Sequence, residues 1–142
     1  MDVKSREEII KFAQKLNSTN LSPLRSGNIS LKTQNNNEEG FLITPSGKKY
    51  DSLKTDDIVF VSFKGKYDEK GLQPSSEWRF HKDIYLNKTD AKAVVHAHSP
   101  HATAVSAHNK DIPAFHYMIA LAGGDNIKCA KYATFGTQEL SD

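Results

Sequence analysis

The sequence predicts an α/β domain, because segments with a helical period alternate with segments that have the composition of β-strands. Three stretches carry this prediction. Residues 5–17 are amphipathic, residues 57–63 form a β-branched and aromatic run, and residues 91–98 lead from Ala and Val into His-Ala-His. A chain of 142 residues can bury one sizeable core, so we expect a single domain over residues 1–142.

The composition is that of an ordinary water-soluble protein, with 37% hydrophobic and 25% charged residues. The net charge of +2 leaves no basic excess for a nucleic acid. The sequence contains no run of about 18 apolar residues, and its amino terminus lacks the apolar core of a signal peptide. The single cysteine excludes an internal disulfide. We therefore expect a cytoplasmic protein that binds neither nucleic acid nor membrane.

The first element is predicted to be a helix over residues 5–17. Ser5 and Glu8 have the spacing of a capping box, in which each side chain bonds the other residue's backbone. Apolar residues then recur on one helical face. They are Ile9, Phe12, Ala13 and Leu16.

The next segments predict a β-hairpin and a further strand. Ile29 and Leu31 alternate with Ser30, as in a strand with one buried face. The polar residues 34–40 predict a turn, and residues 41–43 a second strand. Residues 57–63 are the clearest strand, and we expect them in the middle of a sheet.

Between these strands, residues 44–48 read Thr-Pro-Ser-Gly-Lys and predict a tight turn. The turn has two interpretations. It can be only a connection, or its backbone N–H groups and the Ser46 hydroxyl can hold an anion such as phosphate. The residues alone leave both open.

Ser75 or Ser76 can cap a helix that runs to about Asn87, with Glu77 in its first turn. Glu77 and His81 are four residues apart and so face the same way. Glu77 can be an acid placed favourably at the helix dipole. It can also be a general base or a metal ligand, because the His-Ala-His strand begins a short turn after this helix.

In a strand, the two-residue period turns His96 and His98 to the same side, where both imidazoles can bind one metal ion. We expect residues 91–98 to be a buried strand. Ser99 is a natural N-cap and Pro100 suits the first helical position, so a helix over residues 100–108 should follow. The alternative is a structural His pair with no metal.

The carboxy-terminal part is less regular. Residues 112–119 are apolar around a His116-Tyr117 pair, which can be a half-buried hydrogen bond or can place Tyr117 in a reaction. Residues 127–132 predict a strand. Thr137 caps a helix of one turn, which we expect to have no face to bury.

Five motifs that follow one another along the chain, together with residues 132–141, closely resemble the zinc-dependent class II aldolase and adducin family. They are Ser-Gly-Asn-Ile-Ser at 26–30, Ile-Thr-Pro-Ser-Gly at 43–47, Pro-Ser-Ser-Glu-Trp-Arg-Phe-His at 74–81, Val-Val-His-Ala-His at 94–98 and Ile-Pro-Ala-Phe-His-Tyr-Met-Ile at 112–119. The resemblance implies a three-layer α/β/α sandwich with a mixed, mostly antiparallel central sheet, in a homotetramer. It also implies reversible cleavage of a ketose 1-phosphate into dihydroxyacetone phosphate and an aldehyde such as lactaldehyde.

The resemblance further implies roles for individual residues. His96 and His98 would be Zn²⁺ ligands, and Glu77 would be the acid/base at the carbanion carbon or a further ligand. Tyr117, contributed by a neighbouring subunit, would exchange a proton with the aldehyde oxygen. The residues implied to bind the substrate phosphate are Gly27, Asn28, Ser46, Gly47, Ser75 and Ser76.

The chain departs from the family in two places. Leu24 and Arg25 stand where the aldolases carry Gly and Thr, and Arg25 could replace the lost phosphate donor. The family's third zinc-binding His would lie beyond Asp142, so we expect an amino-terminal portion of an aldolase, with weak metal binding and little turnover by itself. The alternatives within the family are a sugar-phosphate epimerase or dehydratase, or a catalytically silent adducin-like interaction domain.

Overall fold

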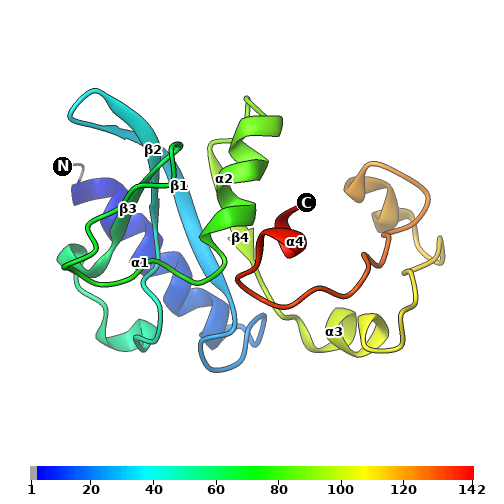
Figure 1. Ribbon diagram of the computed structural model, residues 1–142. Helices are drawn as coiled ribbons and strands as arrows, with labels where there is room; N and C mark the ends of the chain where they lie inside the picture. Colours follow the sequence, from blue (N-terminus) through cyan, green and yellow to red (C-terminus); the bar gives the residue numbers. More distant parts are fainter. Residues whose placement is uncertain (1–2) are drawn as a thin grey trace.

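A computed structural model describes residues 3–142, and Figure 1 shows the chain. Residues 1 and 2, part of the amino terminus in which no signal peptide is expected, lie outside the described residues. The longer elements are α1 (Val3–Ser18), β1 (Asn28–Asn35), β2 (Glu38–Ile43), β3 (Val59–Ser62), α2 (Trp78–Asn87), β4 (Ala93–His96), α3 (Pro100–Ser106) and α4 (Gln138–Ser141). The strands form one sheet in the order β3-β2-β1-β4, with antiparallel neighbours.

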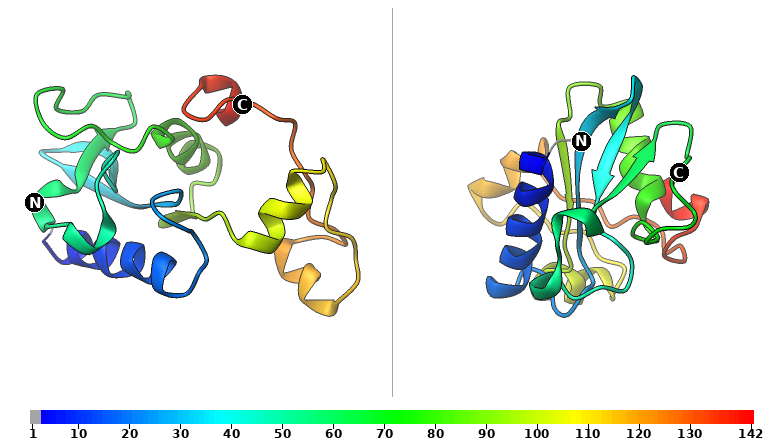
Figure 2. Two further views of the ribbon diagram at one scale, coloured as in Figure 1. Left: turned by 90° about the horizontal axis from the view of Figure 1, so that it is seen from below. Right: turned by 90° about the vertical axis from the view of Figure 1, so that its left-hand side faces the viewer.

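The elements form three layers. The right-hand view of Figure 2 shows α1 on one side of the sheet and α2 with α4 on the other. The core is divided in the same way: one cluster packs around Ile9 and Leu42 between α1 and the sheet, and the other around Phe41 and Tyr85 between α2 and the sheet. The predicted three-layer α/β/α sandwich is therefore confirmed. The sheet was expected to be mixed and mostly antiparallel, and its four described strands pair only antiparallel.

The first helix has the predicted place but different bounds. Because α1 begins at Val3, Ser5 lies inside the helix and the predicted capping box is wrong. Phe12 is 48% exposed, since α1 turns Arg6 toward the sheet along with the apolar residues. The Arg6 guanidinium donates from Nη1 to the carbonyls of Thr55 (2.7 Å) and Ile58 (2.6 Å), which ties α1 to the segment entering β3. The other buried residues of α1 are Ile9, Ala13 and Leu16.

The hairpin is confirmed, with a tighter turn than the polar stretch 34–40 suggests. Its strands extend to Asn35 and restart at Glu38, so only Asn36 and Asn37 make the turn. Both have a positive φ (47° and 64°), the backbone conformation that Asn tolerates best after Gly and that two-residue hairpin turns require.

Ser30 corrects the expectation of a strand with one exposed face. Its side chain is fully buried, because α1 packs on one face of β1 and the α2 side chains His81 and Tyr85 lie against Ser30 on the other. The Ser30 hydroxyl is hydrogen-bonded to Nδ1 of His81 (2.7 Å) and to the Tyr85 hydroxyl (2.8 Å). A buried polar group is tolerated when it is satisfied in this way.

The strand expected in the middle of the sheet lies at its edge within residues 3–142. β3 covers only Val59–Ser62, and Asp57 belongs to the preceding 3₁₀ helix η2 (Thr55–Asp57). The prediction failed because β-branched and aromatic residues report burial of the side chains. They do not report how many neighbouring strands the backbone has.

The His-Ala-His strand is shorter and less buried than predicted. In β4 only Val94 is buried, and Val95 is 58% exposed, because β4 is the other edge of the described sheet. Beyond it the chain leaves the sheet in an arc that carries α3 and the 3₁₀ helix η3 (Tyr117–Ala122), as Figure 1 shows. α3 begins with Pro100 at its first position, as predicted.

One expectation for the end of the chain is wrong. Residues 127–132 form no strand, and Ile127 makes only a single bridge with Ile112. As expected, α4 has no buried residue. It is held on α2 by polar contacts, because the Asp83 carboxylate accepts hydrogen bonds from Gln138 (2.9 Å) and Ser141 (2.5 Å). Thr137 caps α4 as predicted. Among the helices of residues 3–142, none has the length and apolarity needed to cross a bilayer.

Leu24 provides a test of backbone strain in the loop before β1. Its φ is +58° and its side chain is 84% exposed, so it occupies the left-handed region with little packing to compensate. We expect Leu24→Gly to stabilise the protein by ~0.5–1 kcal/mol in urea unfolding, because the strain that Gly relieves is larger than the entropic cost of Gly in the unfolded chain. Leu21→Gly, at an exposed neighbour without a positive φ, should not stabilise. A Leu24→Gly protein less stable than wild type would contradict the strain.

Candidate functional site

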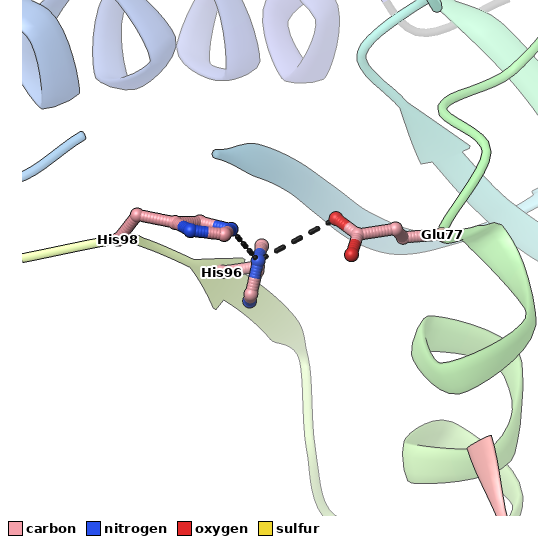
Figure 3. Close-up of side chains that lie close together, drawn as sticks. All are labelled: Glu77, His96 and His98. Atoms are coloured by element: carbon pink, nitrogen blue, oxygen red, sulfur yellow. Dashed lines mark hydrogen bonds and ion pairs between the residues drawn. The ribbon is translucent and has the colours of Figure 1, made fainter. Parts of the chain in front are cut away.

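The site is assembled where β1, β4 and the start of α2 meet. In the antiparallel pairing of β1 with β4, Asn28 lies opposite His96, the last residue of β4. His98 follows two residues later, and Glu77 is the residue immediately before α2. Figure 3 shows the side chains of Glu77, His96 and His98 pointing toward one another.

These three side chains form a compact set of possible metal ligands. The Nε2 atoms of His96 and His98 are 2.8 Å apart, and Nε2 of His96 is 3.4 Å from Oε2 of Glu77. One ligand atom from each residue lies within 4.8 Å of the others, and no other such group occurs among residues 3–142. Two imidazoles and a carboxylate are a ligand set used by catalytic zinc. The donors present therefore fit a divalent metal ion.

The surroundings favour a neutral imidazole at His96. Burial lowers the pKa of His96, Glu77 acts in the opposite direction, and the neighbouring His98 lowers the pKa further. A neutral imidazole carries the lone pair that a metal ion requires, whereas a protonated one does not.

Glu77 is held differently from the expectation. Ser75 and Ser76 are not the N-cap of α2, because the helix begins at Trp78 and Glu77 occupies the cap position. The Glu77 side chain makes no capping bond to the helix. Its Oε2 instead accepts a hydrogen bond from the Asn28 amide at 2.7 Å, which directs the carboxylate toward the end of β4.

A cavity of about 300 Å³ adjoins the metal-ligand set. Glu77 and His98 form part of its wall. The structure brings into the same wall every residue implied to bind phosphate: Gly27, Asn28, Ser46, Gly47, Ser75 and Ser76. The tight turn over residues 44–48 thus lies beside the candidate metal ligands.

Two glycines are needed for the shape of this cavity. A Cβ on Gly27 would lie 2.7 Å from the His96 carbonyl oxygen and 2.7 Å from Ser22 Oγ, so only Gly allows β1 to start this close to β4. Gly47 has a φ of +73°, which Gly adopts without strain. The backbone therefore requires glycine at position 27 and favours it at position 47.

Two cationic side chains line the cavity in different states. Lys48 is paired with Asp57 through an Nζ–Oδ1 distance of 2.6 Å. Arg25, the predicted replacement for a lost phosphate donor, lines the cavity and donates to the Gly47 carbonyl. This bond links the loop before β1 to the turn over residues 44–48.

Tyr50 also lines the cavity, although no sequence pattern indicated it. The Tyr50 hydroxyl donates to the Gly27 carbonyl, and burial, followed by the charge of Glu77, raises the Tyr50 pKa to about 12. Tyr50 stands in no recognisable motif, so only its packing identifies it.

Tyr117 is not part of this cavity. Its side chain is 80% exposed on η3, and its ring centroid is 4.4 Å from that of His116. The expected half-buried hydrogen bond of the pair is wrong, because both residues are exposed and Nδ1 of His116 accepts from the Met118 backbone N–H (3.3 Å).

Comparison with known proteins gives consistent results. Residues 7–142 match the model of the class II aldolase and adducin N-terminal domain. L-fuculose phosphate aldolase of Escherichia coli K12 is 49% identical over 139 residues, which are 98% of this chain and 62% of that protein. The 5-methylthioribulose-1-phosphate/5-deoxyribulose-1-phosphate aldolase of Escherichia coli O45:K1 is 44% identical over 140 residues, or 99% of this chain and 63% of the relative.

A solved structure of an L-fuculose 1-phosphate aldolase superposes with a TM-score of 0.89 at 37% identity, covering 99% of this chain and 65% of that one. The chain thus spans somewhat less than two thirds of the length of these relatives. The match includes the segments that carry Glu77, His96 and His98. The chain belongs to the class II aldolase and adducin family.

Proposed function

We propose that this chain carries the metal- and phosphate-binding part of a zinc-dependent class II aldolase, a carbon–carbon lyase. The proposed substrate is a ketose 1-phosphate of the L-fuculose 1-phosphate type, cleaved to dihydroxyacetone phosphate and L-lactaldehyde. One observation carries the proposal: Glu77 and His98 of the metal-ligand set also line the cavity. The same cavity is lined by the glycines and serines implied to bind phosphate, which are Gly27, Ser46, Gly47, Ser75 and Ser76.

The cavity supports binding of a phosphate through neutral donors. Hydroxyls of Ser46, Ser75 and Ser76 line it, as do the backbones of Gly27 and Gly47. Such donors hold an oxyanion without a cluster of lysines. We propose that Arg25 adds a positive charge there, since Lys48 is already paired.

The carboxylate supports the proton transfer. In the cleavage direction the bond between C3 and C4 breaks, its electron pair stays on the three-carbon fragment, and Glu77 donates a proton to C3. A divalent ion held by His96 and His98 would stabilise the negative charge of that fragment. Because one carboxylate cannot ligate and transfer a proton at once, we propose that Glu77 is a ligand only while no substrate is bound.

On the other fragment, the C4 hydroxyl must lose its proton as the aldehyde carbonyl forms, and the reverse reaction returns that proton to the aldehyde oxygen. We propose Tyr117 for this exchange, contributed by a neighbouring copy in a homotetramer. Its exposure and its position away from the cavity of its own chain support a role between copies. An epimerase or dehydratase of the same fold would use the same metal ligands but would not release dihydroxyacetone phosphate.

The metal site can be tested by titration with Co²⁺, which reports its coordination by visible absorption. We expect one ion per chain, and a loss of affinity greater than about 100-fold in His96→Ala or His98→Ala, beyond the effect of changing a residue that only orients a ligand. His101→Ala on the exposed face of α3 is the matched control. Equal binding by all three variants would disprove the assignment.

The role of Glu77 can be tested without the aldehyde. With metal bound, the protein should exchange a C3 proton of dihydroxyacetone phosphate with D₂O, followed by proton NMR. Glu77→Gln should slow the exchange by about 10²–10⁴-fold, because an amide cannot accept the proton. Exchange at the wild-type rate in Glu77→Gln would exclude Glu77 as the base, and no exchange by the wild type would favour the silent domain.

The charge in the phosphate cavity can be tested at Arg25. Arg25→Met should raise the dissociation constant of dihydroxyacetone phosphate about tenfold, the usual effect of losing a charge-assisted hydrogen bond. Lys49→Met removes the same charge two residues after Gly47 but outside the cavity wall, and should change affinity little. Similar losses in both variants would indicate only a long-range charge effect.

A further inference from the structure

A chain of buried hydrogen bonds leads from the Glu77 carboxylate into the core between the sheet and α2. Asn28 Nδ2 is 2.7 Å from Glu77 Oε2, and Asn28 Oδ1 contacts Nε2 of His81. Nδ1 of His81 is 2.7 Å from the Ser30 hydroxyl, which is 2.8 Å from the Tyr85 hydroxyl. All five side chains are buried, and only Glu77 and Asn28 among them also line the cavity, so solvent competes little for the bonds beyond these two.

The chemistry of the groups fixes the direction of each bond. An ionised carboxylate only accepts, so Asn28 must present its NH₂ group to Glu77 and its carbonyl to His81. His81 must then donate from Nε2 and accept at Nδ1, which makes the Ser30 hydroxyl the donor to His81 and the Tyr85 hydroxyl the donor to Ser30. Every member has one consistent orientation.

His81 can keep this orientation because it is neutral. Burial, followed by the charge of the nearby His96, lowers its pKa to about 3. A neutral imidazole has one donor and one acceptor, and the Asn28 carbonyl, which can only accept, selects the tautomer with the proton on Nε2. His81 is not among the residues that line the substrate cavity, so it can act there only through Asn28 and Glu77.

We propose that His81, acting through Asn28, is a positioning residue that aims the Glu77 carboxylate at His96 and His98. The effect of this positioning on metal binding rests on the proposed function. The hydrogen bonds themselves can be tested without metal or substrate. The positioning also adds to the role implied for Asn28. One N–H of its amide is committed to Glu77 and its carbonyl to His81, which leaves the second N–H for any phosphate contact.

The first test measures hydrogen exchange at the Asn28 side-chain amide by NMR in the metal-free full chain. His81→Leu removes the donor and should speed this exchange at least about tenfold, the lower limit for loss of an orienting partner. His81→Gln keeps an NH₂ group near the position of Nε2 and should leave the exchange slow.

General loss of stability would also speed amide exchange, so a matched control is needed. Val61→Ala removes fully buried apolar atoms from the same core cluster as Tyr85 without touching the chain of hydrogen bonds. If His81→Leu and Val61→Ala speed the Asn28 exchange equally at equal stability, the positioning role is refuted. Nitrogen-15 spectra of His81 showing the proton on Nδ1 would refute it as well.

The second test measures Co²⁺ affinity in the same variants. We expect His81→Leu to weaken binding about 10- to 100-fold, His81→Gln to restore most of it, and Val61→Ala to have little effect. Unchanged affinity in His81→Leu would overturn the positioning role. If wild type binds no Co²⁺, the proposed function fails, while the exchange of the Asn28 amide still decides whether His81 holds the chain of hydrogen bonds.

Discussion

The structure of the site depends on the pairing of Asn28 with His96 across β1 and β4. This register brings the end of the His-Ala-His strand beside the residue whose amide holds Glu77. A shift by one residue would turn Asn28 to the other face of the sheet and separate Glu77 from the imidazoles. The close approach also explains Gly27, because any side chain there would collide with the His96 carbonyl.

The polar side chains that link Glu77 to Tyr85 act as a unit because each of them has a hydrogen-bond partner in the chain. Ser30 and His81 would each be costly to bury alone, but together they complete one another's hydrogen bonds between β1 and α2. The result is a rigid connection between the core and Glu77. A carboxylate oriented in this way loses little freedom when a metal ion or a substrate arrives, and this is the usual advantage of an orienting residue behind a metal ligand.

The charges at the cavity agree with the phosphate binding that we propose. Lys48 is paired with Asp57, whereas Arg25 lines the cavity and donates to the Gly47 carbonyl. Tyr50 stays protonated and holds the Gly27 carbonyl, which leaves the loop backbone in place. Such a site agrees with a chain of nearly balanced charge and with membership of a family whose named relatives act on sugar phosphates.

The sequence by itself determined the elements and their chemistry. The helical period of α1, the His-Ala-His spacing and the glycine turns predicted the α/β class and the candidate ligands, because these features depend on neighbours along the chain. Only the tertiary structure decided which strands lie at the edges, that Ser30 is buried, that Asn28 donates to Glu77, and that Tyr117 lies apart from the cavity. Those outcomes depend on which distant segments pack together. The best example is His81: its spacing from Glu77 placed both on one side of α2, but only the folded chain inserts Asn28 between them.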